Sequence, residues 1–197
     1  MTLEILFALA LFAFASSVTP GPNNLLLMAS GVNFGFKLTL PHMLGVSLGF
    51  VLMSILVGLG VMQMFDSYPI TYDVLKVLSV LYMLYLAYKI ANSSATVQGK
   101  KAGGEPMTFL QAVMFQWVNP KAWTMALTAI SVYAPSKSFS AVVSVSVIFG
   151  LVNFPCITCW VTLGIKIKRL LTQPRSLKVF NYSMASLLVM SLYPIFI

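Results

Sequence analysis

Thr19-Pro20-Gly21-Pro22-Asn23-Asn24 interrupts an apolar run that extends from Leu3 to about Met28. A helix of about 20 apolar residues spans the hydrocarbon core of a membrane, which is about 30 Å thick. Two prolines and a glycine cannot continue a regular helix, because each proline removes a backbone donor and crowds the preceding turn. Irregular backbone at membrane depth is tolerated only where protein buries it or where it lines a wet cavity. The stretch is therefore a candidate binding site.

The composition excludes an ordinary soluble domain. The 197 residues are 59% hydrophobic and 8% charged, with a mean hydropathy of +0.91, whereas soluble domains are about 25% charged. The net charge of +8 does not indicate nucleic-acid binding, because the basic residues are spread over short loops without an aromatic and basic groove. We expect a multi-pass protein of the lipid bilayer whose basic residues set its orientation.

The apolar runs predict an all-α integral membrane protein with six transmembrane helices. An acidic first turn at Glu4, and the apolar runs that follow, favour a first span over a cleaved signal. The expected spans cover about residues 3–28, 38–64, 71–90, 108–133, 139–165 and 179–197. They form a single transporter domain over 1–197, with repeat one at about 1–92, a cytoplasmic loop at about 93–107 and repeat two at about 108–197.

The distribution of basic residues predicts the orientation of these spans. One side carries nine of them: Lys37, Lys89, Lys100, Lys101, Lys166, Lys168, Arg169, Arg175 and Lys178. The other side carries Lys76 and Lys137, together with Glu4, Asp66 and Asp73. Cytoplasmic loops are rich in Lys and Arg, so both termini are expected on the non-cytoplasmic side.

The two halves are expected to be inverted repeats, because three spans per half is an odd number. Asn119-Pro120-Lys121 interrupts the fourth run about 100 residues after the first interruption, so each half begins with a proline-broken span. Matched interruptions in the two halves of a transporter indicate its midplane binding site. Two ordinary proline kinks are the alternative interpretation.

Each interruption has the sequence of a helix N-terminus. Thr19 or Gly21 precedes a proline in the first, and Asn119 precedes Pro120 in the second. The unpaired backbone donors and the positive dipole end of such a terminus suit a carboxylate.

Polar side chains at the interruptions supply further recognition groups. Asn23, Asn24 and Asn119 can donate and accept, so they can orient an amino group. Lys121 lies deep in an apolar run, where a buried ammonium usually serves a function, although it could instead snorkel towards the membrane surface. The predicted substrate site comprises Thr19, Pro20, Gly21, Pro22, Asn23, Asn24, Asn119, Pro120 and Lys121.

Proton coupling, if present, has few candidate residues. No Asp or Glu lies in the middle of an expected span, which leaves His42, near the cytoplasmic end of the second span, and Asp73 as the candidates, besides Lys121, water and the substrate. Cys156 and Cys159 share a helix face and are interpreted as packing residues. Neither a metal site nor a cofactor is predicted, and no enzymatic constellation is apparent.

Motifs over nearly the whole chain resemble one family. They are Thr19-Pro20-Gly21-Pro22-Asn23, the segment with Gly31 and Gly35 to Lys37, Leu44-Gly45 to Gly49, Leu75 with Tyr82-Met83-Leu84-Tyr85-Leu86, and Val118-Asn119-Pro120-Lys121-Ala122-Trp123. Together they resemble the LysE/RhtB amino-acid exporters, and in particular the cysteine/O-acetylserine exporter branch. The resemblance implies an exporter of the bacterial inner membrane that is driven by the proton motive force and can form a homodimer.

These observations predict a secondary active exporter of small amino acids or derivatives, such as cysteine and O-acetylserine or threonine and homoserine. Alternating access would take place at a site between the two broken spans. Two alternatives stay open. One is a membrane thiol–disulfide electron carrier of similar architecture, which would need a cysteine in each half; the other is a passive channel for small solutes.

Overall fold

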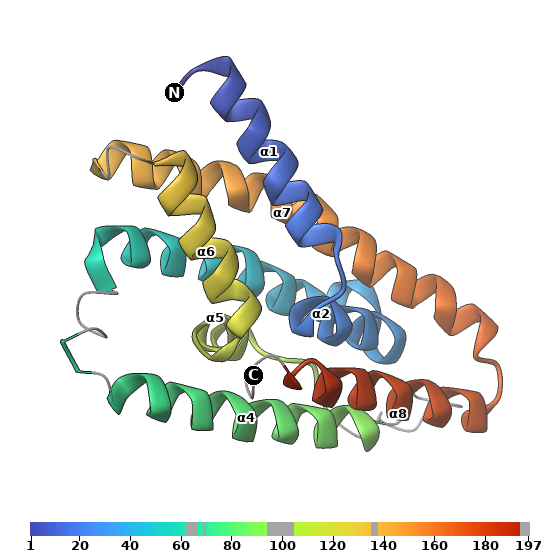
Figure 1. Cartoon of the computed structure of the whole chain (residues 1–197). Coiled ribbons are helices and arrows are strands. Elements are labelled where there is room, and N and C mark those ends of the chain that lie inside the picture. Colours follow the sequence, from blue (N-terminus) through green and yellow to red (C-terminus); the bar gives the residue numbers. More distant parts are fainter. Residues whose placement is uncertain (62–66, 69, 94–104, 135–137, 194–197) are drawn as a thin grey trace.

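The computed structural model describes residues 1–61, 67–68, 70–93, 105–134 and 138–193, and among them it contains helices and no strands. Asp66, Lys100, Lys101 and Lys137, which entered the orientation count, lie outside the described residues. The elements are α1 (Leu3–Val18), α2 (Pro22–Leu56), the π-helical η1 (Val57–Val61), α4 (Ile70–Ala91), α5 (Phe109–Val118), α6 (Pro120–Tyr133), α7 (Phe139–Leu170) and α8 (Pro174–Met190) (Figure 1). The predicted all-α class is confirmed.

Three of the described helical segments are long and apolar enough to cross a membrane: Pro22–Val61, Ile70–Ala91 and Phe139–Leu170. α1 and α5 are shorter apolar helices. Large apolar side chains such as Phe7, Leu81 and Leu151 are more than half exposed, as expected for surfaces that face lipid. The arrangement as six spans in two inverted repeats stays a prediction.

Both predicted interruptions are present. α1 ends at Val18 and α2 begins at Pro22, after the extended residue Gly21. Asn119 has extended backbone angles and lies between α5 and α6, and Pro120 occupies the first position of α6. Each proline begins a helix. A backbone N–H at this position has no acceptor within the helix, so its absence breaks no helical hydrogen bond.

The helix after the first interruption is longer than the sequence predicted. It continues beyond Met28 to Gly35, which has a φ of +77°, a conformation that glycine adopts without steric cost. The Ser30 and Thr39 hydroxyls lie 2.8 Å apart, whereas nine residues of straight helix would separate them by about 13.5 Å. α2 therefore folds back on itself at Gly35, and this sharp reversal replaces the loop expected between spans one and two.

Glycines allow close packing of α2 against α5 and α7 (Figure 1). A Cβ atom at Gly31 would meet the Val161 carbonyl, and one at Gly164 would meet the Met28 carbonyl. Gly45 likewise faces the Phe109 carbonyl of α5. The backbones approach so closely that these positions exclude a side chain, as in other tightly packed membrane helices.

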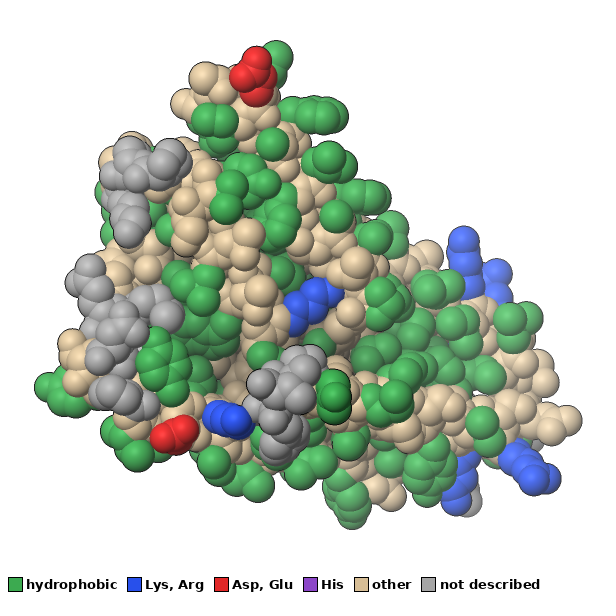
Figure 2. All heavy atoms as spheres, in the orientation of Figure 1, with side chains coloured by type: hydrophobic (Ala, Val, Ile, Leu, Met, Phe, Trp, Pro, Cys, Tyr) green, Lys and Arg blue, Asp and Glu red, His purple; other side chains and the backbone are tan. Residues whose placement is uncertain are grey.

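α4 and α8 lie side by side (Figure 1). The two amides of Asn33 and Asn181 join α2 to α8, with Asn33 Nδ2 donating to Asn181 Oδ1 at 3.0 Å. Figure 2 shows Lys and Arg side chains around the end of the molecule where α7 passes into α8, on a face that is otherwise largely apolar. An acidic side chain lies near the start of α1, where Glu4 occupies the first turn.

We expect Gly164→Ala to lower the unfolding temperature of the purified protein. The new methyl group would meet the backbone carbonyl of Met28, which cannot rotate away, and overpacking of this kind costs about 1–3 kcal/mol. The measurement is thermal unfolding in detergent. The matched control is Leu163→Ala on the same helix, because Leu163 is exposed; equal unfolding temperatures for the two variants would contradict the packing described here.

Candidate functional site

The two interruptions meet through Lys121. Its Nζ donates hydrogen bonds to the Thr19 carbonyl at 2.8 Å, to Thr19 Oγ1 at 2.8 Å and to the Pro20 carbonyl at 3.3 Å. A Cβ atom at Gly21 would lie 2.6 Å from Lys121 Cδ, so a larger residue there would displace the lysine. The structure therefore brings the predicted residues of the first interruption into contact with those of the second.

The environment of Lys121 satisfies its ammonium group without an acidic partner. Thr19 is the C-terminal cap of α1, and the carbonyl end of a helix carries partial negative charge. An unpaired ammonium in a half-buried position costs several kcal/mol, so it requires a hydrogen-bond acceptor at this position. Carbonyls hold it, and the side chain folds back onto the first interruption.

The predicted asparagines hold the interruptions in place. Asn23 and Gln116 form a reciprocal amide pair, with distances of 2.8 and 3.3 Å. Asn24 Nδ2 donates to the carbonyls of Ser17 and Thr19, each at 2.8 Å.

Asn119 caps α6, because its Oδ1 accepts from the Lys121 backbone N–H at 3.2 Å. The side chains of Asn23, Asn24 and Asn119 therefore already have protein partners. Their expected role in orienting an amino group stays a prediction.

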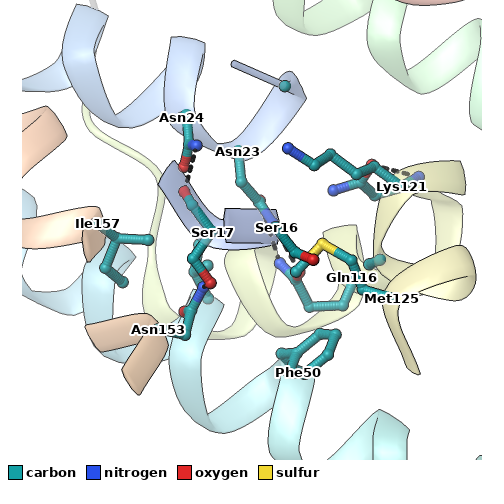
Figure 3. Close-up of a pocket in the computed structure, with 14 residues that line it drawn as sticks. Ser16, Ser17, Asn23, Asn24, Phe50, Gln116, Lys121, Met125, Asn153 and Ile157 are labelled. Atoms are coloured by element: carbon teal, nitrogen blue, oxygen red, sulfur yellow. Dashed lines mark hydrogen bonds between the residues drawn. The ribbon is translucent and has the colours of Figure 1, made fainter. Parts of the chain in front are cut away.

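The sequence analysis did not predict three further candidate residues of this site, which are Ser17, Gln116 and Asn153. Figure 3 shows them lining the same pocket as Asn23 and Lys121. Asn153 Nδ2 donates to Ser17 Oγ at 2.9 Å, and its Oδ1 is buried without a partner among the described residues. The available signal was a polar residue within an apolar run, such as Gln116 or Asn153, whereas the prediction considered the polar residues at the two interruptions.

Two neighbouring spaces lie at Lys121 and share part of their lining. The inner one, between the interruptions, leaves about 20 Å³, which is room for about one water molecule. The outer one, of about 490 Å³, lies against Pro20, Pro22 and Pro120 and is large enough for a small molecule. Ser16, Gly21, Lys121 and Met125 line both spaces, and Lys121 is the only charged residue among the described residues that line either.

The two predicted proton-coupling residues lie elsewhere. His42 is 1% exposed and lines a separate space of about 40 Å³ beside Lys89 and Glu105, and neither ring nitrogen has a partner among the described residues. Asp73 is exposed in the first turn of α4, about 24 Å along that helix from Lys89. Neither residue is among those that line the spaces at Lys121, and proton coupling stays a prediction.

The cysteines also lie away from the interruptions. Cys156 is buried and Cys159 is exposed, both on α7. Across the described part of the chain, no group of three His, Cys, Asp or Glu side chains is arranged to hold a metal ion. The polar chemistry of the pocket therefore consists of amides, hydroxyls, backbone carbonyls and one ammonium.

Comparisons with known proteins identify the family of the chain. The family model described as LysE type translocator matches residues 14–192. The chain is 30% identical over 175 residues to the cysteine/O-acetylserine efflux proteins of Escherichia coli strain K12 and Shigella flexneri, covering 88% of this chain and 89% of each relative. No solved structure matches it. With a match over most of its length, the chain belongs to the LysE-type translocator family.

Proposed function

We propose that this protein is a secondary active exporter of a small neutral amino acid or derivative, with cysteine and O-acetylserine or threonine and homoserine as the candidate substrates. The observation that carries the proposal is the position of Lys121. It is a single cation between the two interruptions, and two backbone carbonyls and one hydroxyl hold its ammonium group. The family of the chain and its relatives, which are named as efflux proteins, support export as the direction.

The substrate carboxylate would replace the carbonyls of Thr19 and Pro20 at the Lys121 ammonium. The ammonium already makes charge-assisted hydrogen bonds to these carbonyls. A carboxylate adds the attraction of a full negative charge, so it competes well for this partner. Lys121 belongs to α6 and its present partners follow α1. Transfer of the ammonium to the substrate therefore loosens the link between the two broken spans, and alternating access follows if the two halves then rock about the site.

The absence of acidic groups from the described lining favours a substrate without a cationic side chain. A second positive charge next to Lys121 would be repelled and would lose its water without compensation. The same lining accommodates a zwitterion, because its carboxylate neutralises Lys121. Neutral amino acids are therefore the proposed class, and lysine and arginine are excluded from it.

We place both termini on the non-cytoplasmic side of the bacterial inner membrane, on the basis of the Lys and Arg distribution. The proposed driving force is the proton motive force. With no carboxylate in the described lining, the proton would move through His42, Asp73, Lys121, water or the amino group of the substrate.

Energised inverted membrane vesicles that contain the protein should accumulate labelled cysteine or O-acetylserine against a gradient, and an uncoupler should abolish the accumulation. Threonine, homoserine, leucine and lysine complete the panel, and lysine is expected not to accumulate. A passive channel would equilibrate its solute without accumulation. No accumulation of any of these compounds, in vesicles shown to contain the protein, would contradict the proposal.

Lys121→Ala should lower export by at least about 30-fold, because loss of a partner from a buried charged pair costs roughly 2 kcal/mol or more. The measurement is initial uptake into inverted vesicles at matched protein content. Lys166→Ala is the control, since Lys166 is an exposed lysine near the end of α7. Wild-type export by Lys121→Ala would remove this residue from the site.

Export should survive replacement of both cysteines by serine. Neither Cys156 nor Cys159 lies at an interruption, so the exporter does not require their thiols, whereas a thiol–disulfide carrier does. Uptake rates of the double variant Cys156→Ser, Cys159→Ser within about twofold of wild type are expected. Complete loss of function in a folded double variant would favour the electron carrier.

A further inference from the structure

We propose that Asn153 recognises the α-ammonium group of the exported amino acid, by accepting a hydrogen bond at Oδ1. This inference rests on the function proposed above and adds a specificity-determining residue to it. Asn153 lies near the middle of α7, outside both interruptions, and neither proline motif includes it.

The side-chain amide of Asn153 has a protein partner at its nitrogen and none among the described residues at its oxygen. Nδ2 donates to Ser17 Oγ at 2.9 Å. The residue is 6% exposed, and its Oδ1 is buried with no hydrogen-bond partner among the described residues. The large majority of buried side-chain polar atoms in proteins bind a protein group or an ordered water. The described residues supply no partner for this acceptor, and we assign that place to the ammonium group of the ligand.

Asn153 and Lys121 line the same inner space. Figure 3 shows Asn153 beside Ser17 and Ile157 on one side of the pocket and Lys121 beside Met125 on the other. The pocket thus has a cation for a carboxylate on one side and an acceptor on the other, and its space of about 20 Å³ must widen before an amino acid can reach both. An α-amino acid carries the two matching groups, a carboxylate and an ammonium.

Each of the other amides of this pocket makes at least one hydrogen bond within the protein. Asn23 pairs with Gln116, Asn24 binds the carbonyls of Ser17 and Thr19, and Asn119 caps α6. Among the described lining residues, Asn153 Oδ1 is the one buried side-chain oxygen without a partner. The structure therefore favours Asn153 over the three asparagines of the proline motifs for contact with the amino group.

A neutral amide suits this task better than a carboxylate would. An ammonium group is a donor only, and an amide oxygen is an acceptor with two lone pairs. A carboxylate at this position would compete with the substrate for Lys121, the one cation of the pocket. The amide accepts from the ammonium and leaves Lys121 available to the carboxylate of the substrate.

The test compares each amino acid with its analogue that lacks the amino group. Binding of cysteine and of 3-mercaptopropionate, and of O-acetylserine and 3-acetoxypropionate, is measured calorimetrically on the purified full-length protein. For at least one pair we expect wild type to bind the amino acid at least about tenfold more tightly. In Asn153→Ala this preference should fall to within about threefold, while the affinity for the analogue stays unchanged.

A matched control and a second variant separate recognition from folding. Asn181→Ala removes a buried amide that pairs with Asn33 outside the pocket, so it should keep the wild-type preference. Asn153→Asp keeps the size and the acceptor oxygens. Its carboxylate should lower the affinity for both members of each pair by competing for Lys121, but it should retain a preference of at least about tenfold for the amino acid even if Asn153→Ala does not fold.

Three results would overturn the inference alone. The first is an unchanged preference in Asn153→Ala. The second is loss of the preference in Asn153→Asp, which would mean that the amide nitrogen faces the ligand. The third is equal binding of both members of each pair by wild type. Failure of folded wild-type protein to bind any of the four compounds would overturn the inference together with the proposed substrate class.

Discussion

The hydrogen bonds between the Lys121 ammonium and the backbone carbonyls of Thr19 and Pro20 are the interaction on which the site depends. They join residues more than 100 positions apart and connect the start of α6 to the end of α1. An ammonium in an apolar environment requires a partner, and a chain that has left helical geometry exposes carbonyls that require donors. The carbonyls of the first interruption therefore accept hydrogen bonds from the ammonium of the second, and each interruption supplies the partner that the other requires.

The rest of the site keeps these two irregular segments in register. Asn24 returns two hydrogen bonds to the end of α1, and the pair of Asn23 with Gln116 joins α2 to α5. These amides replace the water that would satisfy the same groups outside a membrane. Because they are neutral, they stabilise the irregular backbone without adding charge to the pocket, which leaves Lys121 as the single charge that a ligand meets.

Sequence reasoning located both interruptions and Lys121, because proline chemistry and the cost of a buried charge are local properties of the chain. It missed the reversal at Gly35, since a single residue with positive φ carries no signal beyond the glycine itself. It also missed Asn153, whose open acceptor depends on Ser17, a residue 136 positions away. His42 stays a candidate proton carrier because an imidazole can titrate at physiological pH. Its position outside the lining at Lys121 is a tertiary property that the spacing of residues does not encode.

The charge balance of the proposed site restricts how transport can be driven. The empty pocket carries one positive charge, on Lys121. A zwitterion adds no net charge: its carboxylate neutralises Lys121 and its ammonium restores one positive charge at the amide. A single charge that crosses the membrane potential is worth about 2.3 kcal/mol per 100 mV. Since loaded and empty carriers have the same charge, the potential favours neither form, and in the proposed exporter the electrical driving force must enter with the coupled proton.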